Sequence, residues 1–413
     1  MVEPRICERK RTLVVWAPVS LEPPMSGDKA NEFERIRILS SRYKVRAFVL
    51  LSIARIREAR TYSRTLEECG AEIWVLPWID LYGFRTLSSV TAASVVALAV
   101  LLLRVSAGVD LVITRGAFYS IPLIMACKIA NVSLLYSIPS QALSHLETGF
   151  VKPAHVRLYS LLAKPADYFV LMHADFWGVA SSSAELDLLR FFGKDARRKI
   201  TSLPLPIPEE FYEAMPPKTD ERQMTLTYNG STSYLYDFNS LVIALRKMNS
   251  EGRRVCLTVY TSEAGRKKLG SLDAGGEGYL RLESELPRRK MIEAVGRATA
   301  MVIPLSRQVK LEGGRIPIKA IEAMALRVPV IISNPNDPIF QDGVTCIVVS
   351  DDSPEAWENA ISRISGSTSR KSIVKGARAV AERFRSSRNV EIVSRLLDRN
   401  HGDSSSARPR SID

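Results

Sequence analysis

The sequence predicts an α/β protein with two domains, each built on a doubly wound parallel sheet. Short apolar, β-branched runs alternate with helical patterns along most of the 413 residues, as expected for strands joined by right-handed βαβ crossovers. Most runs lack polar alternation, which is typical of parallel strands buried on both faces. The alternation stops at a proline-rich stretch, 204–217, and then starts again. We therefore expect two domains, with a ligand-binding cleft between them at the carboxyl ends of the strands.

The first domain is expected over residues 1–207. Its predicted strands are Leu13–Ala17, Val45–Leu51, Ile73–Pro77, Leu111–Thr114, Val132–Ser137, Tyr168–Leu171 and Ile200–Leu203. The helical patterns between them are Lys29–Ser40, a stretch that ends at Gly70, Ser89–Val105, Ile121–Ala130 and His155–Ala163. Gly70 is a candidate helix C-cap, because glycine adopts the left-handed conformation there without strain. Residues 208–223 have the proline-rich, polar composition of a linker.

The second domain is expected over residues 224–400. Its predicted strands are Thr225–Asn229, Val255–Tyr260, Tyr279–Leu282, Ala300–Pro304, Val328–Ile332 and Thr345–Val349. The helices are Phe238–Asn249, Arg289–Arg297, Pro317–Ala325 and Pro354–Ile364, followed by basic helical patterns from Ser372 to Arg399. Ser353 is the expected N-cap of the fourth of these helices. Residues 401–413 are rich in Ser and Arg and are expected to be disordered.

Composition and cysteine usage favour a protein of the reducing cytoplasm. Hydrophobic residues make up 46% of the chain and charged residues 24%, a profile that excludes a disordered chain, collagen and a polytopic membrane protein. The 5 cysteines are scattered without a C-x-x-C pair, which fits buried free thiols. The basic N-terminus lacks the apolar core of a signal peptide. The uncharged stretch 86–103 has three interpretations: a buried helix, a helix on a membrane surface, or a span.

Several well-known functional motifs are absent from the sequence. There is no G-x-x-x-x-G-K-[ST] and no G-x-G-x-x-G after the first strand, which argues against a P-loop NTPase and a dinucleotide oxidoreductase. There is no G-x-S-x-G, H-E-x-x-H or Asp-x-Asp, and 4 histidines leave no histidine-rich metal site. The net charge of +13 predicts attraction to an anion. Nucleic acid is not expected, because the basic residues are not interleaved with aromatics on one stripe.

The most informative segment runs from Gly313 to Ala325. A glycine pair, Gly313 and Gly314, lets the backbone approach a ligand, and the helix start that follows offers free N–H groups to an anion. Arg315 and Lys319 are four residues apart and are candidates to hold a diphosphate. Glu322, one turn further on, is a candidate acceptor of hydrogen bonds from ligand hydroxyls. The alternative is an ordinary helix that carries a Lys319–Glu322 surface pair.

This segment is followed by Pro329-Val330-Ile331-Ile332-Ser333 and by Asp342-Gly343. Together they resemble the donor-binding segment of a large family of retaining glycosyltransferases, glycosyl transferases group 1, which is marked by an E-x7-E motif. The resemblance implies the GT-B fold, in which two Rossmann-like doubly wound domains face a cleft that holds a nucleotide-sugar. It assigns Glu322 to the second glutamate, which holds the ribose. The position of the first glutamate is occupied by Gly314, and Glu312 lies two residues away. Pro317-Ile318-Lys319-Ala320-Ile321-Glu322 fits the P-x-K-x-x-E variant of the motif.

A second departure from the family pattern lies after the predicted strand Thr225–Asn229. The family often has Gly-Arg there, with a lysine soon after, to hold the diphosphate, whereas this chain has Gly230 and Ser231. We expect Arg307, Lys310 or Arg315 to supply the missing charge. Each of these cations is otherwise explained as a solvated loop residue.

In the first domain the resemblance points to two loops. Gly27 fits the glycine-bearing loop that touches donor and acceptor, and Asp28 is a candidate acceptor contact or a simple N-cap. His145 follows the strand Val132–Ser137, in the loop where many family members have a histidine near the reacting carbon. Its alternative role is that of a loop histidine with local hydrogen bonds.

The resemblance implies a glycosyltransferase that moves a sugar from a nucleotide-sugar to a glycan or lipid-linked acceptor, with retention and without metal or cofactor. The charge on the leaving diphosphate would then be met by cations, a helix start and peptide N–H groups. The alternative is a catalytically impaired GT-B homologue that binds sugar nucleotides or glycans, because the first glutamate and Gly-Arg are missing. An epimerase or phosphorylase of the same fold also remains open. The cations at both ends of the chain and the apolar run Val95–Leu103 favour peripheral contact with the cytoplasmic membrane face.

Overall fold

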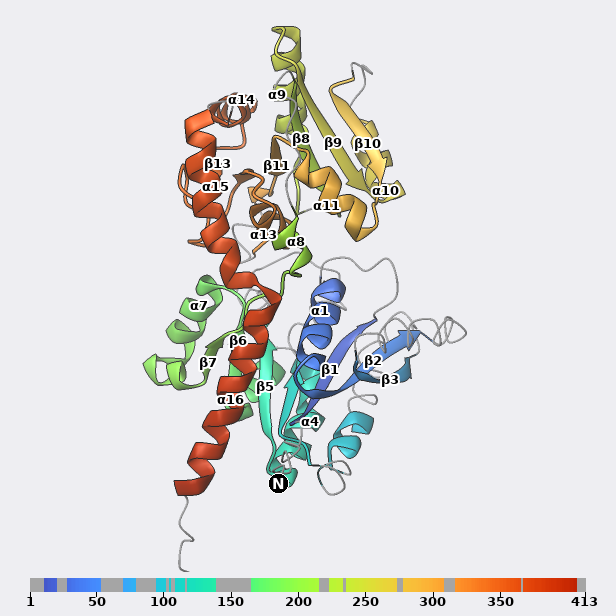
Figure 1. Cartoon of the computed structure of the whole chain (residues 1–413), viewed down its shortest axis with the longest axis vertical. Coiled ribbons are helices and arrows are strands. Elements are labelled where there is room, and N and C mark those ends of the chain that lie inside the picture. Colours follow the sequence, from blue (N-terminus) through green and yellow to red (C-terminus); the bar gives the residue numbers. More distant parts are fainter. Residues whose placement is uncertain are drawn as a thin grey trace, which may run out of the picture. The chain divides into compact units, whose positions relative to one another are not determined.

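The computed structural model describes residues 11–20, 28–52, 70–78, 94–101, 104, 108–115, 117–138, 165–214, 223–232, 235–272, 278–307, 316–364 and 367–406. The chain divides into two compact units, each built around its own sheet (Figure 1). The first unit comprises Met1–Ala180, Leu188–Pro206 and Ser386–Asp413, and the second comprises Ser181–Asp187 and Ile207–Arg385.

The first unit contains a seven-stranded parallel sheet in the order β3-β2-β1-β4-β5-β6-β7. The strands are β1 (Thr12–Ser20), β2 (Lys44–Ser52), β3 (Glu72–Trp78), β4 (Leu111–Thr114), β5 (Ser133–Ile138), β6 (Phe176–Val179) and β7 (Ile200–Ser202). The described helices are α1 (Asp28–Ser40), residues 94–101, α4 (Ala117–Ala130), residues 165–173, the second half of α7 (Ser182–Phe192), the 3-10 helix η2 (Lys194–Arg198) and α16 (Ser386–Ser406). The first half of α7, up to Asp187, belongs to the second unit. Six of the seven predicted strands overlap these elements, because continuous apolar runs suit strands that are buried on both faces.

One predicted strand is wrong. Tyr168–Leu171 lies within the helix at residues 165–173, and the strand at this point of the chain is β6. The burial pattern explains the difference, because Val170 and Leu171 are buried while Tyr168 and Met172 are exposed, as on a helix with one apolar face. A four-residue apolar run does not distinguish a buried strand from such a helix.

The helix α16 belongs to the first unit, although it is the last element of the chain. Its residues Val393, Leu396 and Leu397 are buried in the same cluster as Ile36 and Leu39 of α1. Figure 1 shows α16 in red beside the blue α1. A second link joins Arg11 to Asp398, whose atoms Nη1 and Oδ1 are 2.9 Å apart. The helix runs to Ser406 and so enters the segment 401–413 that was expected to be disordered.

The second unit contains a six-stranded parallel sheet in the order β10-β9-β8-β11-β12-β13. The strands are β8 (Met224–Asn229), β9 (Val255–Thr261), β10 (Leu280–Ser284), β11 (Ala300–Ile303), β12 (Val330–Ser333) and β13 (Ile347–Val349). The helices are α8 (Glu210–Glu213), α9 (Asn239–Ser250), α10 (Glu263–Gly270), α11 (Arg288–Gly296), α13 (Ile318–Ala325), α14 (Pro354–Arg363), α15 (Ser367–Ala381) and the 3-10 helix η3 (Glu382–Phe384). Every predicted strand of this domain overlaps an observed one.

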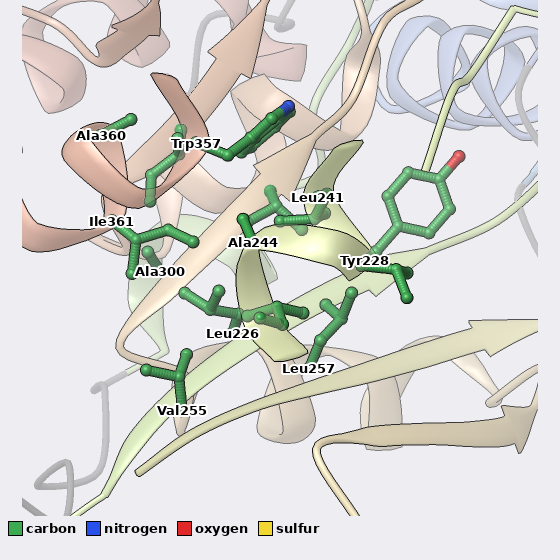
Figure 2. Packing of buried hydrophobic residues seen from close by; sticks show 14 of the residues in the cluster. Leu226, Tyr228, Leu241, Ala244, Val255, Leu257, Ala300, Trp357, Ala360 and Ile361 are labelled. Atoms are coloured by element: carbon green, nitrogen blue, oxygen red, sulfur yellow. The ribbon is translucent and has the colours of Figure 1, made fainter. Parts of the chain in front are cut away.

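The core of the second unit is formed by side chains from strands and helices. Figure 2 shows Leu226 and Leu257 of neighbouring strands packed with Ala244 of α9 and with Trp357 of α14. The predicted N-cap is confirmed, because the Ser353 side chain accepts a hydrogen bond from the N–H of Ala356 at 3.1 Å. The helix α10 was not predicted, and its N-cap is Ser262.

The described residues contain no helix that is both long and apolar enough to cross a membrane. In the helix at residues 94–101, Val96 and Val100 are fully buried, whereas Val95 and Leu98 are about half exposed. This part of the apolar stretch 86–103 is thus an amphipathic helix. Among the described cysteines, Cys127, Cys256 and Cys346 are buried and free, as expected.

Candidate donor site at the edge of the second sheet

The sheet of the second unit reverses its winding between β8 and β11. From β8 the chain moves outward through β9 to β10, and from β11 it moves the other way through β12 to β13. At such a point, the loops that leave two neighbouring parallel strands diverge, and ligands bind at the carboxyl ends of the strands. Gly230 and Ser231 follow β8, and Arg307 comes shortly after β11. Three predicted site residues therefore lie at this edge.

Lys319 brings a cation to the same edge from the first turn of α13. The helix begins at Ile318, after Pro317, whose φ of −64° suits a helix start. The ammonium nitrogen of Lys319 donates a hydrogen bond to the Tyr228 hydroxyl at 2.7 Å. It lies 4.0 Å from the ring centroid of Tyr228 and 4.4 Å from that of Tyr236. These are cation–π distances, so the two rings and the hydroxyl hold the positive charge in one place.

Gly230 lies close to this ammonium. Its φ is +104°, which favours glycine, and a β-carbon at this position would lie 3.1 Å from the Lys319 nitrogen. The Tyr228 hydroxyl donates in turn to the carbonyl of Ser231. Figure 2 shows this hydroxyl pointing away from the apolar side chains around it. Tyr228 thus connects the lysine to the loop after β8.

Burial changes the proton affinity of both ionisable groups on α13, although each side chain keeps some exposed surface. It lowers the pKa of Lys319 to about 7, and the nearby charge of Glu322 only partly opposes this. It raises the pKa of Glu322 to about 7, against the opposing charges of Arg288 and Lys319. Perturbed groups of this kind are frequent at functional sites, because a bound ligand can supply the missing polar partner.

Arg307 is at the end of β11 but has a protein partner. Its Nε is 2.5 Å from Oδ2 of Asp352, and its side chain is 71% exposed. Asn334 links the same aspartate to the loop, because its side-chain amide donates to Asp352 at 2.7 Å and to the carbonyl of Leu305 at 2.9 Å. Arg307 is therefore oriented at the edge of the sheet. Among the described cations, however, it is Lys319 that lies beside Gly230.

Two buried polar atoms at this edge have no hydrogen-bond partner within the described part of the chain. They are Oδ1 of Asn229, the last residue of β8, and Oγ of Ser306, just beyond β11. Buried polar atoms are normally paired, so an unpaired one at a strand end is a candidate ligand contact. No group of three or more His, Cys, Asp or Glu within the described ranges could hold a metal ion.

The first unit has a corresponding reversal between β1 and β4. Glu32 of α1 accepts hydrogen bonds from Arg35 at 2.8 Å and from Arg115, the residue after β4, at 3.2 Å. Arg35 also donates to Ser137 near the end of β5 at 3.3 Å. Arg35 and Glu32 are almost fully buried, and the Nε of Arg35 has no partner in the described residues. This cluster is a candidate functional site of the first unit.

The remaining predicted site residues lie outside the described part of the chain. They are Gly27, His145, Lys310, Glu312, Gly313, Gly314 and Arg315. Asp28 is the first residue of α1, but its side chain also lies outside that part. The described residues therefore bring together Gly230, Ser231, Lys319 and Glu322 from the predicted set.

The two tyrosines of the site were not among the predicted residues. Tyr228 is the penultimate residue of a buried strand, and Tyr236 follows it in the next loop. The available signal was an aromatic residue two positions before a glycine at a strand end. Lys268 of α10 is a further unpredicted cation near this loop, and its ammonium donates to the carbonyl of Thr232 at 2.9 Å.

Residues 225–366 match the family model of glycosyl transferases group 1. The second unit carries a glycosyl transferases group 1 domain. This domain contains the edge formed by β8, β11 and α13. A search of curated protein sequences finds no significant match to the chain.

Solved structures share the fold over nearly the whole chain. HepE from Anabaena in complex with UDP has a TM-score of 0.69 at 14% identity, covering 94% of this chain and 100% of that one. A sucrose-phosphate synthase from Thermosynechococcus elongatus has a TM-score of 0.69 at 13% identity, covering 95% and 100%. A putative UDP-N-acetylglucosamine 2-epimerase from Listeria monocytogenes has a TM-score of 0.59 at 12% identity, covering 98% and 100%.

The comparisons confirm the resemblance drawn from Gly313–Ala325. The group 1 domain is a glycosyltransferase family domain, and the two parallel sheets with their helices are those of the GT-B fold. The structures with 12–14% identity establish the fold alone.

Proposed function

We propose that the protein transfers a sugar from a nucleotide-sugar to a glycan or lipid-linked acceptor, with retention and without a metal ion. The observation that carries the proposal is the position of Lys319, whose ammonium lies beside Gly230 at the β8–β11 edge of a group 1 domain. A cation held there can neutralise the charge that develops on a leaving diphosphate. UDP is the first nucleotide to test, because the similar HepE structure contains UDP.

In the proposed reaction, Lys319 and the peptide N–H groups of the loop after β8 bind the diphosphate. Glu322 accepts hydrogen bonds from the ribose hydroxyls. The acceptor attacks the face from which the diphosphate leaves, and its proton passes to the departing phosphate, so that no separate base is needed. The first unit supplies the acceptor site, for which the Glu32–Arg35–Arg115 cluster is the candidate. Peripheral contact with the cytoplasmic membrane face is part of the proposal for lipid-linked acceptors.

The experiment is incubation of the full chain with radiolabelled nucleotide-sugars and with lipid or glycan acceptors, followed by measurement of transfer and of donor hydrolysis. Lys319→Met is the test variant. Lys267→Met is the matched control, because Lys267 is an exposed lysine of the same unit that pairs with Glu263 on α10. We expect the wild type and Lys267→Met to be active and Lys319→Met to be impaired.

Absence of transfer and hydrolysis across the panel, with folded protein, would contradict the proposal. Nucleotide binding without turnover would favour the second candidate, a GT-B homologue that binds sugar nucleotides but does not transfer the sugar. The motif favours this candidate at one point, because Gly314 stands where the family has its first glutamate.

A further inference from the structure

Three helices of the first unit cover the same face of its sheet. The strands β4, β5, β6 and β7 are neighbours in chain order, so right-handed crossovers place α4, the helix at 165–173 and α7 on one side. The helix α1 joins β1 to β2 in the opposite direction along the sheet and therefore lies on the other side.

Each of these three helices exposes large apolar side chains. Five such side chains are 47–74% exposed: Met125 and Ile129 of α4, Tyr168 and Met172 of the helix at 165–173, and Phe191 of α7. We refer to these five residues as the α4–α7 face. Single exposed apolar residues are ordinary, but several on adjacent helices of one face mark an interaction surface.

Contacts between side chains, and between side chains and the backbone, link the three helices. Tyr168 stacks on Phe192 with ring centroids 5.7 Å apart, and Phe192 contacts Phe191 at 5.0 Å. Lys199, which follows η2, donates to the carbonyl of Met172 at 2.8 Å. Lys128 of α4 is 3.2 Å from Asp175, two residues after the helix at 165–173. These contacts place the helix at 165–173 next to the end of α7, and the end of α4 next to the residues that follow the helix at 165–173.

Cations border this face. From Leu188 to Lys199 the sequence holds Arg190, Lys194, Arg197, Arg198 and Lys199 against a single acidic residue, Asp195. Four of these cations, all except Lys199, are exposed, and η2 carries three of the four directly beyond Phe191 and Phe192. Apolar and aromatic side chains bordered by Lys and Arg are the pattern of a surface that binds the interface of an anionic bilayer.

We propose that the α4–α7 face docks the first unit onto an anionic lipid bilayer, with its apolar side chains at the acyl boundary and its cations among the headgroups. This surface is distinct from the segments that favoured membrane contact in the sequence, which were the two ends of the chain and Val95–Leu103. The inference extends the membrane contact included in the proposed function. It would present the acceptor site of the same unit to a lipid-linked acceptor.

The test is co-sedimentation of the full chain with vesicles of phosphatidylglycerol and phosphatidylcholine, and with vesicles of phosphatidylcholine alone. We expect binding to the anionic vesicles that weakens with added salt, because surface charges are screened. Each basic side chain near such a surface contributes about fivefold to binding. Arg197→Gln with Arg198→Gln should therefore weaken binding by about 25-fold, and Tyr168→Ser with Phe191→Ser should weaken binding to the anionic vesicles at any salt concentration.

Matched controls come from the second unit. Ile243→Ser with Val344→Ser removes two apolar side chains of similar exposure, and Lys267→Gln with Arg289→Gln removes two exposed cations. Both control pairs should bind vesicles like the wild type. The proposal is overturned if the wild type ignores anionic vesicles, if the control pairs lose as much binding as the test pairs, or if the Tyr168 and Phe191 changes dissolve a dimer instead. Because the assay measures no sugar transfer, its failure would leave the transferase proposal standing.

Discussion

The ammonium nitrogen of Lys319 lies 3.1 Å from the point that a β-carbon of residue 230 would occupy, so Gly230 and Lys319 depend on each other. The glycine leaves room for the ammonium, and Tyr228 ties both to the end of β8. The group 1 domain thus has a cation beside the loop that follows β8. This arrangement leads to the first three predictions.

Replacing Lys319 by Met should weaken UDP binding strongly. A hydrogen bond to a charged group is worth about 1.5–3 kcal/mol, or roughly 10- to 150-fold in Kd. The measurement is isothermal titration calorimetry, with Lys267→Met as the control variant that keeps wild-type affinity. Equal affinity of Lys319→Met and the wild type would remove Lys319 from the diphosphate site.

Gly230→Ala should lower both stability and nucleotide affinity, whereas Gly252→Ala should lower stability only. Both glycines have positive φ, +104° and +84°, and a β-carbon in the left-handed region costs about 1–2 kcal/mol. No atom lies within 4 Å of a β-carbon at Gly252, whereas Gly230 has the Lys319 ammonium beside it. Urea denaturation measures the first effect and calorimetric titration with UDP the second. If the two variants bind UDP equally well, the contact between Gly230 and Lys319 has no role in binding.

The affinity for UDP-glucose should be highest near pH 7 and fall on both sides. The free protein loses the Lys319 proton as pH rises above its pKa of about 7, so binding must take up a proton there. Below pH 7 the Glu322 carboxyl, whose pKa is also about 7, is protonated. It must release this proton before both of its oxygens can accept hydrogen bonds from the ribose hydroxyls. On each side of pH 7, the Kd for UDP-glucose should rise, approaching a tenfold increase per pH unit.

Single variants separate the two limbs of this pH profile. Glu322→Gln should abolish the fall at low pH and keep the fall at high pH, and Lys319→Met should do the reverse. UDP-glucose is preferable to UDP as the titrant, because the terminal phosphate of UDP itself titrates near pH 6. Calorimetry in two buffers of different ionisation enthalpy counts the protons directly. A profile that is flat from pH 6 to 8 would contradict both assignments.

Arg115→Met should raise the KM for the acceptor that the transfer assay identifies and leave the Kd for UDP unchanged. Arg115 is 13% exposed at the β1–β4 reversal, where it shares Glu32 with Arg35. Arg46→Met is the control, because Arg46 is equally well buried but pairs with Glu72 between β2 and β3. Both variants should lose stability, and only Arg115→Met should change the acceptor KM. An unchanged acceptor KM would mean that the Glu32–Arg35–Arg115 cluster has a structural role only.

Gly376→Ala should destabilise the second unit, because a β-carbon there would overlap the carbonyl oxygen of Val344. Overpacking of this kind costs about 1–3 kcal/mol. Gly270→Ala provides the comparison, since its β-carbon would make only an ordinary contact with Leu282 at 3.9 Å. It should leave stability within about 1 kcal/mol of the wild type. Urea denaturation of both variants checks the difference, and equal stabilities would mean that α15 can shift away from Val344.

The strands were predictable from the sequence where burial on both faces leaves a continuous apolar run. Leu111–Thr114 is an example, because the predicted and observed bounds of β4 are the same. The run Tyr168–Leu171 is as apolar but forms part of a helix, since its exposed and buried residues alternate with helical spacing. The observed strand β6 contains Gly178, and glycine is unfavourable inside a strand, so the sequence pattern does not predict a strand there. Its glycine is needed because a β-carbon there would overlap Leu203.

The site was predictable only where one short segment carries it. Lys319 and Glu322 are three residues apart on one helix, so their proximity follows from the sequence. The contact between Lys319 and Tyr228 joins residues 91 positions apart, and no local pattern specifies such a pairing. Arg307, Lys310 and Arg315 were the predicted replacements for the missing arginine. Lys319 was a predicted diphosphate ligand, but its position beside Gly230 depends on the packing of α13 against β11 and β12.

The return of α16 to the first unit also bears on how the protein is made. Val393, Leu396 and Leu397 complete the apolar cluster around Ile36 and Leu39, yet the whole second unit is translated between these two groups. At about 5–20 residues per second, a nascent first unit would wait roughly 10–40 s for its last helix. During that time the side of α1 that α16 later covers would be open to water, and to chaperones. The unit that is synthesised first is therefore the one that finishes folding last.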